Sequence, residues 1–511
     1  MGDRALSSAG TLASDVIGLS APRTFHLARA TLSMEPSTAP QSLFLLGNSG
    51  LDPSKVSNWQ MLRKMTVTDR IDARGIMLTD EDNQLLTRVG PGTPMGELLR
   101  RFWLPALLSD ELPEPDCDPI RTRHLGEDLI AFRDTNGRVG IVDTLCPHRS
   151  APLFFGRNEE CGLRCVYHGW KYDVDGNCID IPSEPPDSVM KDHISVKAYP
   201  TYELAGVIWL YMGPPHLRPE RPPELPFTLL KDEQRTGLKF LVESNFLQNL
   251  EGELDTAHVS FLHATLNDDS AALNTLIRVE GYNNDRHPRL SIIDTDYGFL
   301  YGGRRTKPNG EYYWRVTQYL LPIYGLIPRS GGYLGGATIW VPIDDYTCWR
   351  FLIGGVAEMH APDGPQASGL PPMSIERGTY TFRDGTVIDT RLSTDNKSNL
   401  YGMDRQKQRT VNYTGMTAIP TQDQAMNEGM GAIADRSREH LAPTDVAIIR
   451  MRALMLKLVT DLQNGIEPTA PHRPELYRVR SLDVDAAFAE LTELVEHFSD
   501  DMRIEEGEPV F

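Results

Sequence analysis

The segment Cys146-Pro147-His148-Arg149, followed by Cys165-Val166-Tyr167-His168, decides how this chain is interpreted. Sixteen residues separate His148 from Cys165, so the pattern is C-x-H-x16-C-x2-H. Each short segment carries one cysteine and one histidine, and nearby turn signals such as Asn136-Gly137 predict that the segments lie on hairpins. Two thiolates and two imidazoles in this order predict a metal centre.

Two kinds of metal centre use these ligand types. In a Rieske [2Fe–2S] cluster one iron takes both cysteines and the other takes both histidines. A structural zinc site instead usually pairs its ligands as C-x2-4-C and H-x3-5-H. The mixed order therefore favours the cluster, with Cys146, His148, Cys165 and His168 as its ligands. The other cysteines are expected to be ordinary small core residues: Cys117, Cys161, Cys178 and Cys348.

This pattern resembles the Rieske domain of the aromatic-ring oxygenases, and the resemblance extends from about residue 77 to near the C-terminus. It implies an α+β protein in which a β-rich Rieske domain precedes a catalytic domain with an antiparallel sheet flanked by helices (helix-grip or START-like). Six prolines between residues 213 and 226 place the boundary, giving domains 77–215 and 216–511. Residues 1–76 show no sustained period and predict a poorly ordered extension.

A second candidate metal site follows the pattern E-x3-D-x2-H-x4-H, built from Glu251, Asp255, His258 and His263. Two histidines and one carboxylate form a facial triad for Fe(II). Positions i and i+5 lie about 140° apart on an ideal helix, so the helix is expected to bulge or to end between the two histidines. Asp255 and His258 are expected to share a helix face, with Asp255 orienting the imidazole.

The third ligand has to come from elsewhere in the chain. The stretch 422–428, which begins Gln422-Asp423, resembles a downstream segment of the phthalate dioxygenase branch of the family. That resemblance implies Asp423 as the ligand, with Glu428 and Asp435 as the alternatives.

The same resemblance implies a longer-range role for Asp255. In the resembling enzymes the matching aspartate bridges an iron-ligand histidine to a Rieske histidine of the neighbouring subunit. Carried over, Asp255 links His258 to His168 of the next chain, which implies a homotrimer or a stacked hexamer.

A substrate pocket is expected near residues 312–321, where large aromatic and polar residues alternate. On a strand, Tyr313 and Arg315 would share one face. An apolar slot with one guanidinium suits an aromatic carboxylate. Asn245 is expected either to line the pocket or to serve as a structural amide. Other arginines could take the place of Arg315 as the substrate contact, namely Arg278, Arg304 and Arg305.

The composition of the 511 residues narrows the function classes. A net charge of −19 disfavours nucleic acid and anionic membranes as partners. No stretch reaches the roughly 18 apolar residues of a membrane span. Six cysteines are too few for a disulfide scaffold, which favours a reducing, cytoplasmic location. No G-x-G-x-x-G opens a helix after a strand, so a separate flavin/iron–sulfur reductase is expected to supply electrons.

Together these features predict a terminal oxygenase with one [2Fe–2S] cluster and one mononuclear Fe(II) per chain. It would use dioxygen to hydroxylate a small aromatic acid, as in phthalate-like cis-dihydroxylation. The alternative is a monooxygenase that O-demethylates methoxylated aromatic acids with the same ligands. A Rieske electron carrier without oxygenase activity is a further alternative, and the 251–263 pattern speaks against it.

Local signals also predict particular elements. Thr93-Pro94 is expected to begin a helix. Thr444 is expected to cap a helix that runs to about Asn464. Strands are expected over Tyr312–Leu321 and Thr338–Ile343.

Overall fold

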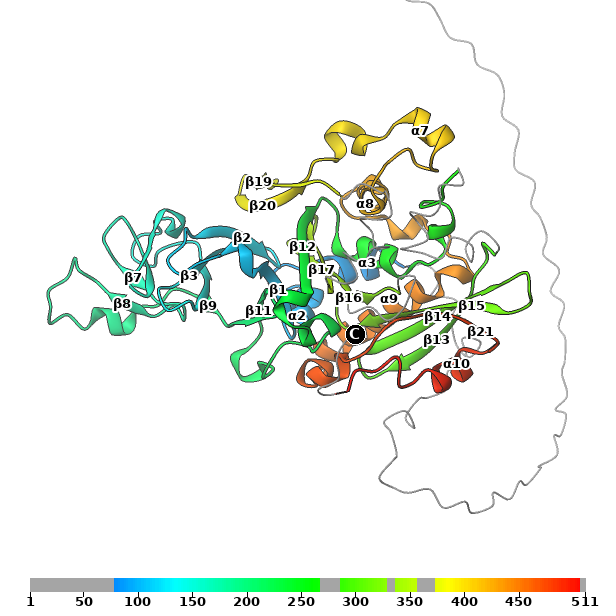
Figure 1. The fold of residues 1–511 in the computed structure, drawn as a ribbon. Coiled ribbons are helices and arrows are strands. Elements are labelled where there is room, and N and C mark those ends of the chain that lie inside the picture. The colour runs from blue at the N-terminus through cyan, green and yellow to red at the C-terminus, as the bar shows by residue number, and fades with distance from the viewer. Residues whose placement is uncertain (1–77, 267–284, 329–335, 356–372, 506–511) are drawn as a thin grey trace, which may run out of the picture. The chain divides into compact units, whose positions relative to one another are not determined.

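The computed structural model describes residues 78–266, 285–328, 336–355 and 373–505 (Figure 1). These residues belong to one compact unit, Met61–Phe511. The extension predicted over residues 1–76 and the candidate Arg278 lie outside the described residues. Each helix in the described ranges is too short or too polar to span a lipid bilayer.

The described chain begins with two short helices, α1 (Asp80–Thr87) and α2 (Pro94–Leu99). The predicted start of α2 is confirmed, because the Thr93 side chain accepts a hydrogen bond from the N–H of Gly96 and Pro94 occupies the first turn. Proline is tolerated there because the first N–H groups of a helix have no intrahelical acceptor.

Three small antiparallel sheets follow, with strand orders β1-β11-β10, β2-β3-β4-β9 and β5-β6-β7-β8. The expected hairpin at Asn136-Gly137 joins β3 to β4, and Gly137 has a φ of +80° that favours glycine. The strands are β1 (Trp103–Leu108), β2 (Ile120–His124), β3 (Glu127–Arg133), β4 (Val139–Asp143), β5 (Arg157–Glu159), β6 (Gly162–Arg164), β7 (Lys171–Tyr172), β8 (Cys178–Asp180), β9 (Ala198–Tyr199), β10 (Thr201–Leu204) and β11 (Val207–Tyr211).

The second half is built on an eight-stranded antiparallel sheet of order β12-β18-β17-β16-β15-β14-β13, in which β21 also pairs with β15. The strands predicted at 312–321 and 338–343 are confirmed as β15 and β17. The sheet strands are β12 (Arg235–Val242), β13 (Arg289–Thr295), β14 (Gly298–Thr306), β15 (Tyr312–Leu320), β16 (Tyr324–Leu326), β17 (Ala337–Pro342), β18 (Cys348–Gly355) and β21 (Leu482–Ala486). A separate hairpin consists of β19 (Ile375–Thr381) and β20 (Val387–Ser393).

The helices α3 (Phe246–Leu254), α9 (Val446–Gln463) and α10 (Leu491–His497) contact this sheet. Helix α8 (Ile419–Gly429) packs on α3, and α7 (Arg405–Thr410) lies away from the sheet (Figure 1). Helix α3 packs on β16 and β17, and α9 packs against α1, α2 and α3. The α+β class with a β-rich first part and an antiparallel catalytic sheet is thereby confirmed.

The predicted cap of the long helix is wrong. Thr444 lies in a short 3-10 turn (Pro443–Asp445), and α9 begins at Val446 without a side-chain cap. The burial of apolar residues such as Met451 and Met455 stabilises α9, so a terminal hydrogen bond is not needed to form it.

Two separate hydrophobic cores result. A small core surrounds the cysteine loops and includes Cys146, Cys165 and Trp170. A large core combines apolar residues of α1, α2, β1 and β11 with those of the eight-stranded sheet and α9. The small core therefore stabilises the cysteine loops, and the large core stabilises the eight-stranded sheet and the helices that pack on it.

Candidate metal centres and substrate cavity

The two cysteine segments form loops of the same backbone construction. In each loop the N–H of the cysteine, Cys146 or Cys165, donates to the carbonyl five residues later. The N–H four residues after the cysteine donates back to its carbonyl, and that residue, Ser150 or Gly169, has a positive φ. The repeated construction presents one cysteine and one histidine from each loop.

The four side chains suit an iron–sulfur cluster. Both thiols are almost fully buried, with Cys146 2% and Cys165 3% exposed. The rings of His148 and His168 lie 4.4 Å apart between centroids. Nδ1 of His148 is buried and has no hydrogen-bond partner among the described residues, so it is free to bind a metal ion. Burial raises the pKa of the Cys165 thiol, and a bound metal would stabilise its thiolate.

Neighbouring side chains hold this arrangement in place. The ring of Trp170 stacks on His148 at 4.4 Å with an interplanar angle of 6°. Sγ of Cys146 lies 3.2 Å from the Tyr172 hydroxyl. A hydrogen bond to a cluster sulfur is one of the means by which proteins adjust a cluster's reduction potential.

The second site lies where α3 ends. The helix stops at Leu254, so both histidines follow its end, and His258 begins a 3-10 turn (His258–Ser260). The expected shared helix face of Asp255 and His258 is therefore wrong. Asp255 is instead the C-cap residue, and its Oδ1 accepts from the N–H groups of Ala257 at 2.7 Å and His258 at 3.3 Å.

This turn still brings Asp255 to the imidazole, with Oδ2 3.5 Å from Nδ1 of His258. Burial opposes ionisation of Asp255, but His258 and the backbone N–H groups outweigh it and lower the pKa of the carboxyl. An ionised Asp255 holds the proton of His258 on Nδ1 and leaves Nε2 free to bind a metal.

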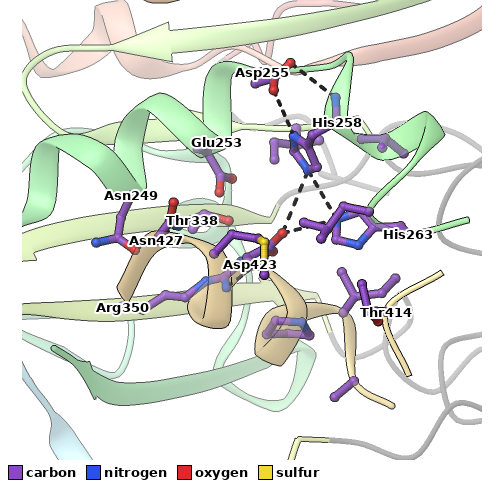
Figure 2. A pocket seen from close by; sticks show the side chains of 18 of the residues that line it. Asn249, Glu253, Asp255, His258, His263, Thr338, Arg350, Thr414, Asp423 and Asn427 are labelled. Atoms are coloured by element: carbon purple, nitrogen blue, oxygen red, sulfur yellow. Dashed lines mark hydrogen bonds and ion pairs between the residues drawn. The ribbon is translucent and has the colours of Figure 1, made fainter. Parts of the chain in front are cut away.

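Figure 2 shows His258, His263 and Asp423 pointing toward one another. The two Nε2 atoms are 3.2 Å apart, and Oδ1 of Asp423 lies 3.2 Å from Nε2 of His263 and 3.8 Å from that of His258. Adjacent ligands bound at about 2.1 Å to one metal ion are roughly 3 Å apart. The three atoms therefore fit one facial triad, which leaves positions open for dioxygen.

The alternative carboxylates are used elsewhere. Glu428 accepts from the Tyr401 hydroxyl at 2.8 Å, and Asp435 caps the turn that contains Ser437. Asp423 lies on α8, and its carboxylate is the one that approaches Nε2 of both histidines among the described residues. Burial opposes its ionisation, yet the histidines and a nearby arginine lower the pKa of Asp423 to about 2.

Gln422 has a role that the sequence interpretation missed. Nδ1 of His263 lies 2.7 Å from Oε1 of Gln422, and both side chains are buried. The amide N of Gln422 donates to the carbonyl of Met416 at 3.0 Å, which fixes the orientation of the amide. His263 must then donate from Nδ1, which leaves its Nε2 available to bind a metal ion. The position beside Asp423 is the signal that could have identified this residue.

Replacing Gln422 with leucine should lower the affinity of the site for Fe(II) by about 10- to 100-fold, because the imidazole of His263 loses the partner that orients it. Titration of iron-free protein with Fe(II) measures this. The matched control is Gln424→Leu, since Gln424 is equally buried on α8 but donates to Glu428. Equal iron affinity in the Gln422 and Gln424 variants would contradict the assignment.

The three convergent side chains lie in the wall of a cavity of about 1000 Å³. The face of the eight-stranded sheet forms one side, and α3, α8 and the turn between the histidines form the other. Much of the wall is apolar, contributed by Leu238, Val259, Phe261, Tyr301, Trp340, Leu352, Met403, Met416, Ile419 and Met426. Such a lining favours an aromatic or aliphatic ligand.

The structure shows which of the candidate arginines can contact a substrate in the cavity. Arg315 on β15 lines the cavity. Arg305 is buried against the carbonyl of Thr256, and Arg304 stacks on the ring of Tyr312, so neither takes the place of Arg315. Three further charged residues that sequence reasoning did not single out also line the cavity: Glu253, Arg350 and Arg405.

Asn245 is not brought to the cavity, which corrects its expected place in the pocket. It is fully buried as the N-cap of α3, where its Oδ1 accepts from the N–H of Leu247. Its amide N donates to the carbonyls of Thr87 and Asp345. These three hydrogen bonds satisfy the side chain, so Asn245 is a structural amide.

Comparison with known proteins agrees with this arrangement. The Rieske [2Fe-2S] domain matches residues 102–200, and the LigXa C-terminal domain like family matches residues 210–486. The phthalate 4,5-dioxygenase oxygenase subunit of Pseudomonas putida is 39% identical, covering 76% of this chain and 88% of that protein. The 3-chlorobenzoate-3,4-dioxygenase oxygenase subunit of Comamonas testosteroni is 37% identical, covering 78% and 93%.

A third relative, the 5,5'-dehydrodivanillate O-demethylase oxygenase subunit of Sphingobium sp., is 30% identical and covers 77% of this chain and 83% of that protein. Its reaction, by name, differs from that of the two dioxygenases, although all three are oxygenase subunits. The similarity spans both the cysteine loops and the cavity-bearing sheet. The chain therefore belongs to the family of Rieske-type oxygenase subunits.

Proposed function

We propose that the protein is the terminal oxygenase of a multicomponent system and that it cis-dihydroxylates a small aromatic acid of the phthalate type. The observation that carries this proposal is the convergence of His258, His263 and Asp423 in the wall of a largely apolar cavity. The two most similar relatives described above carry the names of dioxygenases for aromatic acids, which supports the substrate class.

The proposed cofactor ligands follow from the two sites. Cys146, His148, Cys165 and His168 would hold the [2Fe–2S] cluster, while His258, His263 and Asp423 would hold one Fe(II). When bound, these groups supply single electrons and the activation of dioxygen. A separate flavin/iron–sulfur reductase would deliver the electrons.

The chain's own residues bind and orient the reactants. Asp255 and Gln422 hold the two imidazoles with their Nε2 atoms toward the metal position. Arg315 contributes a buried guanidinium that would pair with the substrate carboxylate, and the apolar wall would hold the ring and exclude water.

We further propose that Asp255 joins His258 to His168 of a neighbouring chain in a homotrimer or stacked hexamer. Between the two halves of one chain, we propose a domain boundary at residue 216, six residues after the start of the segment matched by the second family description.

Product analysis tests the proposed reaction. The iron-loaded protein, a compatible reductase and labelled dioxygen should convert at least one phthalate-type acid to a cis-dihydrodiol that carries both labelled atoms. Iron analysis should give about three irons per chain, two in the cluster and one at the triad. The O-demethylase named above supports the alternative, for which methoxylated acids would yield a phenol and formaldehyde instead. Absence of oxygenated product from every acid, with all sites loaded, would contradict both.

A further inference from the structure

Two glutamates of α3 lie two residues apart and have opposite environments. Glu251 is buried and satisfied, because Arg436 and Arg452 both donate to its carboxylate at 2.6 to 2.9 Å. Glu253 is equally buried, at 7% exposure, but its Oε1 has no hydrogen-bond partner among the described residues. Glu253 lines the cavity, and Figure 2 shows its carboxyl in the space between α3 and the helix that carries Asp423.

A glycine in the neighbouring strand provides the space that the Glu253 side chain occupies. A Cβ at Gly325 of β16 would lie 2.6 Å from Cγ of Glu253, so the glycine is required for the close approach. Gly325 pairs in register with Thr338 of β17, and Thr338 also lines the cavity. A buried polar atom that lacks a partner lowers the stability of the fold, so its retention in a cavity wall points to a contact with a ligand.

Two unpartnered donors lie on the same sheet face. Trp340 and Arg350 are cross-strand partners on β17 and β18, and the guanidinium of Arg350 lies 4.7 Å from the centroid of the indole ring. Nε1 of Trp340 and Nε of Arg350 are both buried without a hydrogen-bond partner in the described part of the chain. These residues are 2% and 6% exposed, and both line the cavity with Glu253.

Proximity of the three groups is supported by their electrostatic effects. Burial raises the pKa of the Glu253 carboxyl, while the charge of Arg350 and the approach of the Thr338 and Trp340 donors to the carboxyl act in the opposite direction. A terminal nitrogen of Arg350, Nη1, lies 3.7 Å from Oδ2 of Asp423. The unpartnered atoms therefore lie next to the proposed metal ligand, where the reacting part of a substrate would be held.

We propose that Glu253, Trp340 and Arg350 form a subsite that binds a hydroxyl group on the ring of the substrate. A hydroxyl has one donor hydrogen and two acceptor lone pairs. The subsite offers the complement, namely one acceptor oxygen on Glu253 and two N–H donors. The carboxyl oxygen can accept whether Glu253 is ionised or neutral, so the match does not depend on its protonation.

Other substituents fit less well. A methoxy group has no hydrogen to donate and would leave Oε1 of Glu253 unpaired. A carboxylate only accepts, so it would repel Glu253 wherever that group is ionised. The proposal rests on the proposed function, since it names the substituent of the aromatic acid for which the cavity is suited. It makes the three residues specificity-determining residues.

Binding measurements test the subsite without turnover. Anaerobic calorimetry of the iron-loaded protein should use benzoate, the three hydroxybenzoates and the three benzene dicarboxylates as ligands. At least one hydroxybenzoate should bind about tenfold or more tightly than benzoate, because only the hydroxyl pairs the three unpartnered atoms. Trp340→Phe, which keeps a ring but loses the donor, should reduce that preference several-fold.

Changes at Glu253 complete the test. Glu253→Leu should abolish the preference for the hydroxyl, and Glu253→Gln should retain most of it because a carbonyl oxygen remains. The visible spectrum of the cluster and the melting temperature identify variants that fold. If Glu253→Leu does not fold, Trp340→Phe decides the question.

The outcomes separate the two proposals. If benzoate and every hydroxybenzoate bind equally well, or if the preference survives in Glu253→Leu, the subsite is overturned and the proposed function stands. If a benzene dicarboxylate binds more tightly than benzoate while no hydroxybenzoate does, the subsite is likewise overturned, and the three residues bind an anion instead. If no aromatic acid binds, the proposed function fails and the subsite fails with it.

Discussion

Replacing Asp423 with alanine should remove the mononuclear iron and abolish oxygenation, while the cluster spectrum stays intact. Asp423 is the carboxylate whose Oδ1 lies 3.2 Å from Nε2 of His263, and two histidines alone leave the proposed triad without its anionic ligand. The cysteine loops belong to a different hydrophobic core, so they should keep their cluster. Iron analysis, the visible spectrum and product formation measure the three parts of this prediction.

The matched control is Asp435→Ala. Asp435 is an acid of the same downstream segment, but it caps a turn and is exposed, so its loss should leave the iron content unchanged. Normal iron content and activity in Asp423→Ala would show that another group completes the triad. Glu428 would then be the next residue to replace, although its carboxylate is held by Tyr401 and Gln424.

Asp255→Asn should slow the oxidation of the reduced cluster by orders of magnitude when substrate and dioxygen are added. The amide keeps the size of the side chain but loses its charge and half of its acceptor capacity. His258 would lose the anion that orients it, and the proposed bridge to the neighbouring chain would lose its charged partner. The cluster itself should form and accept electrons from the reductase, so rapid-mixing spectroscopy of its visible band isolates the effect.

Asp344→Asn is the control for the backbone role of Asp255. Asp344 also accepts from the N–H groups two and three residues later, at 2.8 and 2.9 Å. Loss of a turn acceptor alone should cost about 1 kcal/mol or less in the free energy of unfolding and should leave cluster oxidation near normal. Wild-type oxidation kinetics in Asp255→Asn would rule out the bridging role.

The two glutamates of α3 illustrate what could not be predicted from the sequence. Glu251 and Glu253 are the same residue type on the same helix, and both are buried. Only packing decides that Glu251 meets Arg436 and Arg452, which are distant in sequence, while Glu253 meets the cavity. Asn245 illustrates the same limit, since its three hydrogen-bond partners come from three segments.

Features that depend on short spacings could be predicted from the order of the residues alone. The C-x-H and C-x2-H loops, the hairpin at Asn136-Gly137 and the start of α2 at Thr93-Pro94 all depend on neighbours within a few residues. The close spacing of His258 and His263 likewise restricted how far apart these two side chains could lie. Local backbone geometry is sufficient for such features, because turns and caps form within a few residues.

Contacts between residues that are far apart in the chain became apparent only in the folded protein. Folding brought Asp423 and Gln422 to histidines about 160 positions earlier in the chain, and it stacked Arg350 on Trp340 in the wall of the cavity. It also ended α3 before His258, so that a turn rather than a helix face presents Asp255. Such contacts could not be predicted because the burial of apolar faces selects which elements pack together, and many distant residues contribute to that selection at once.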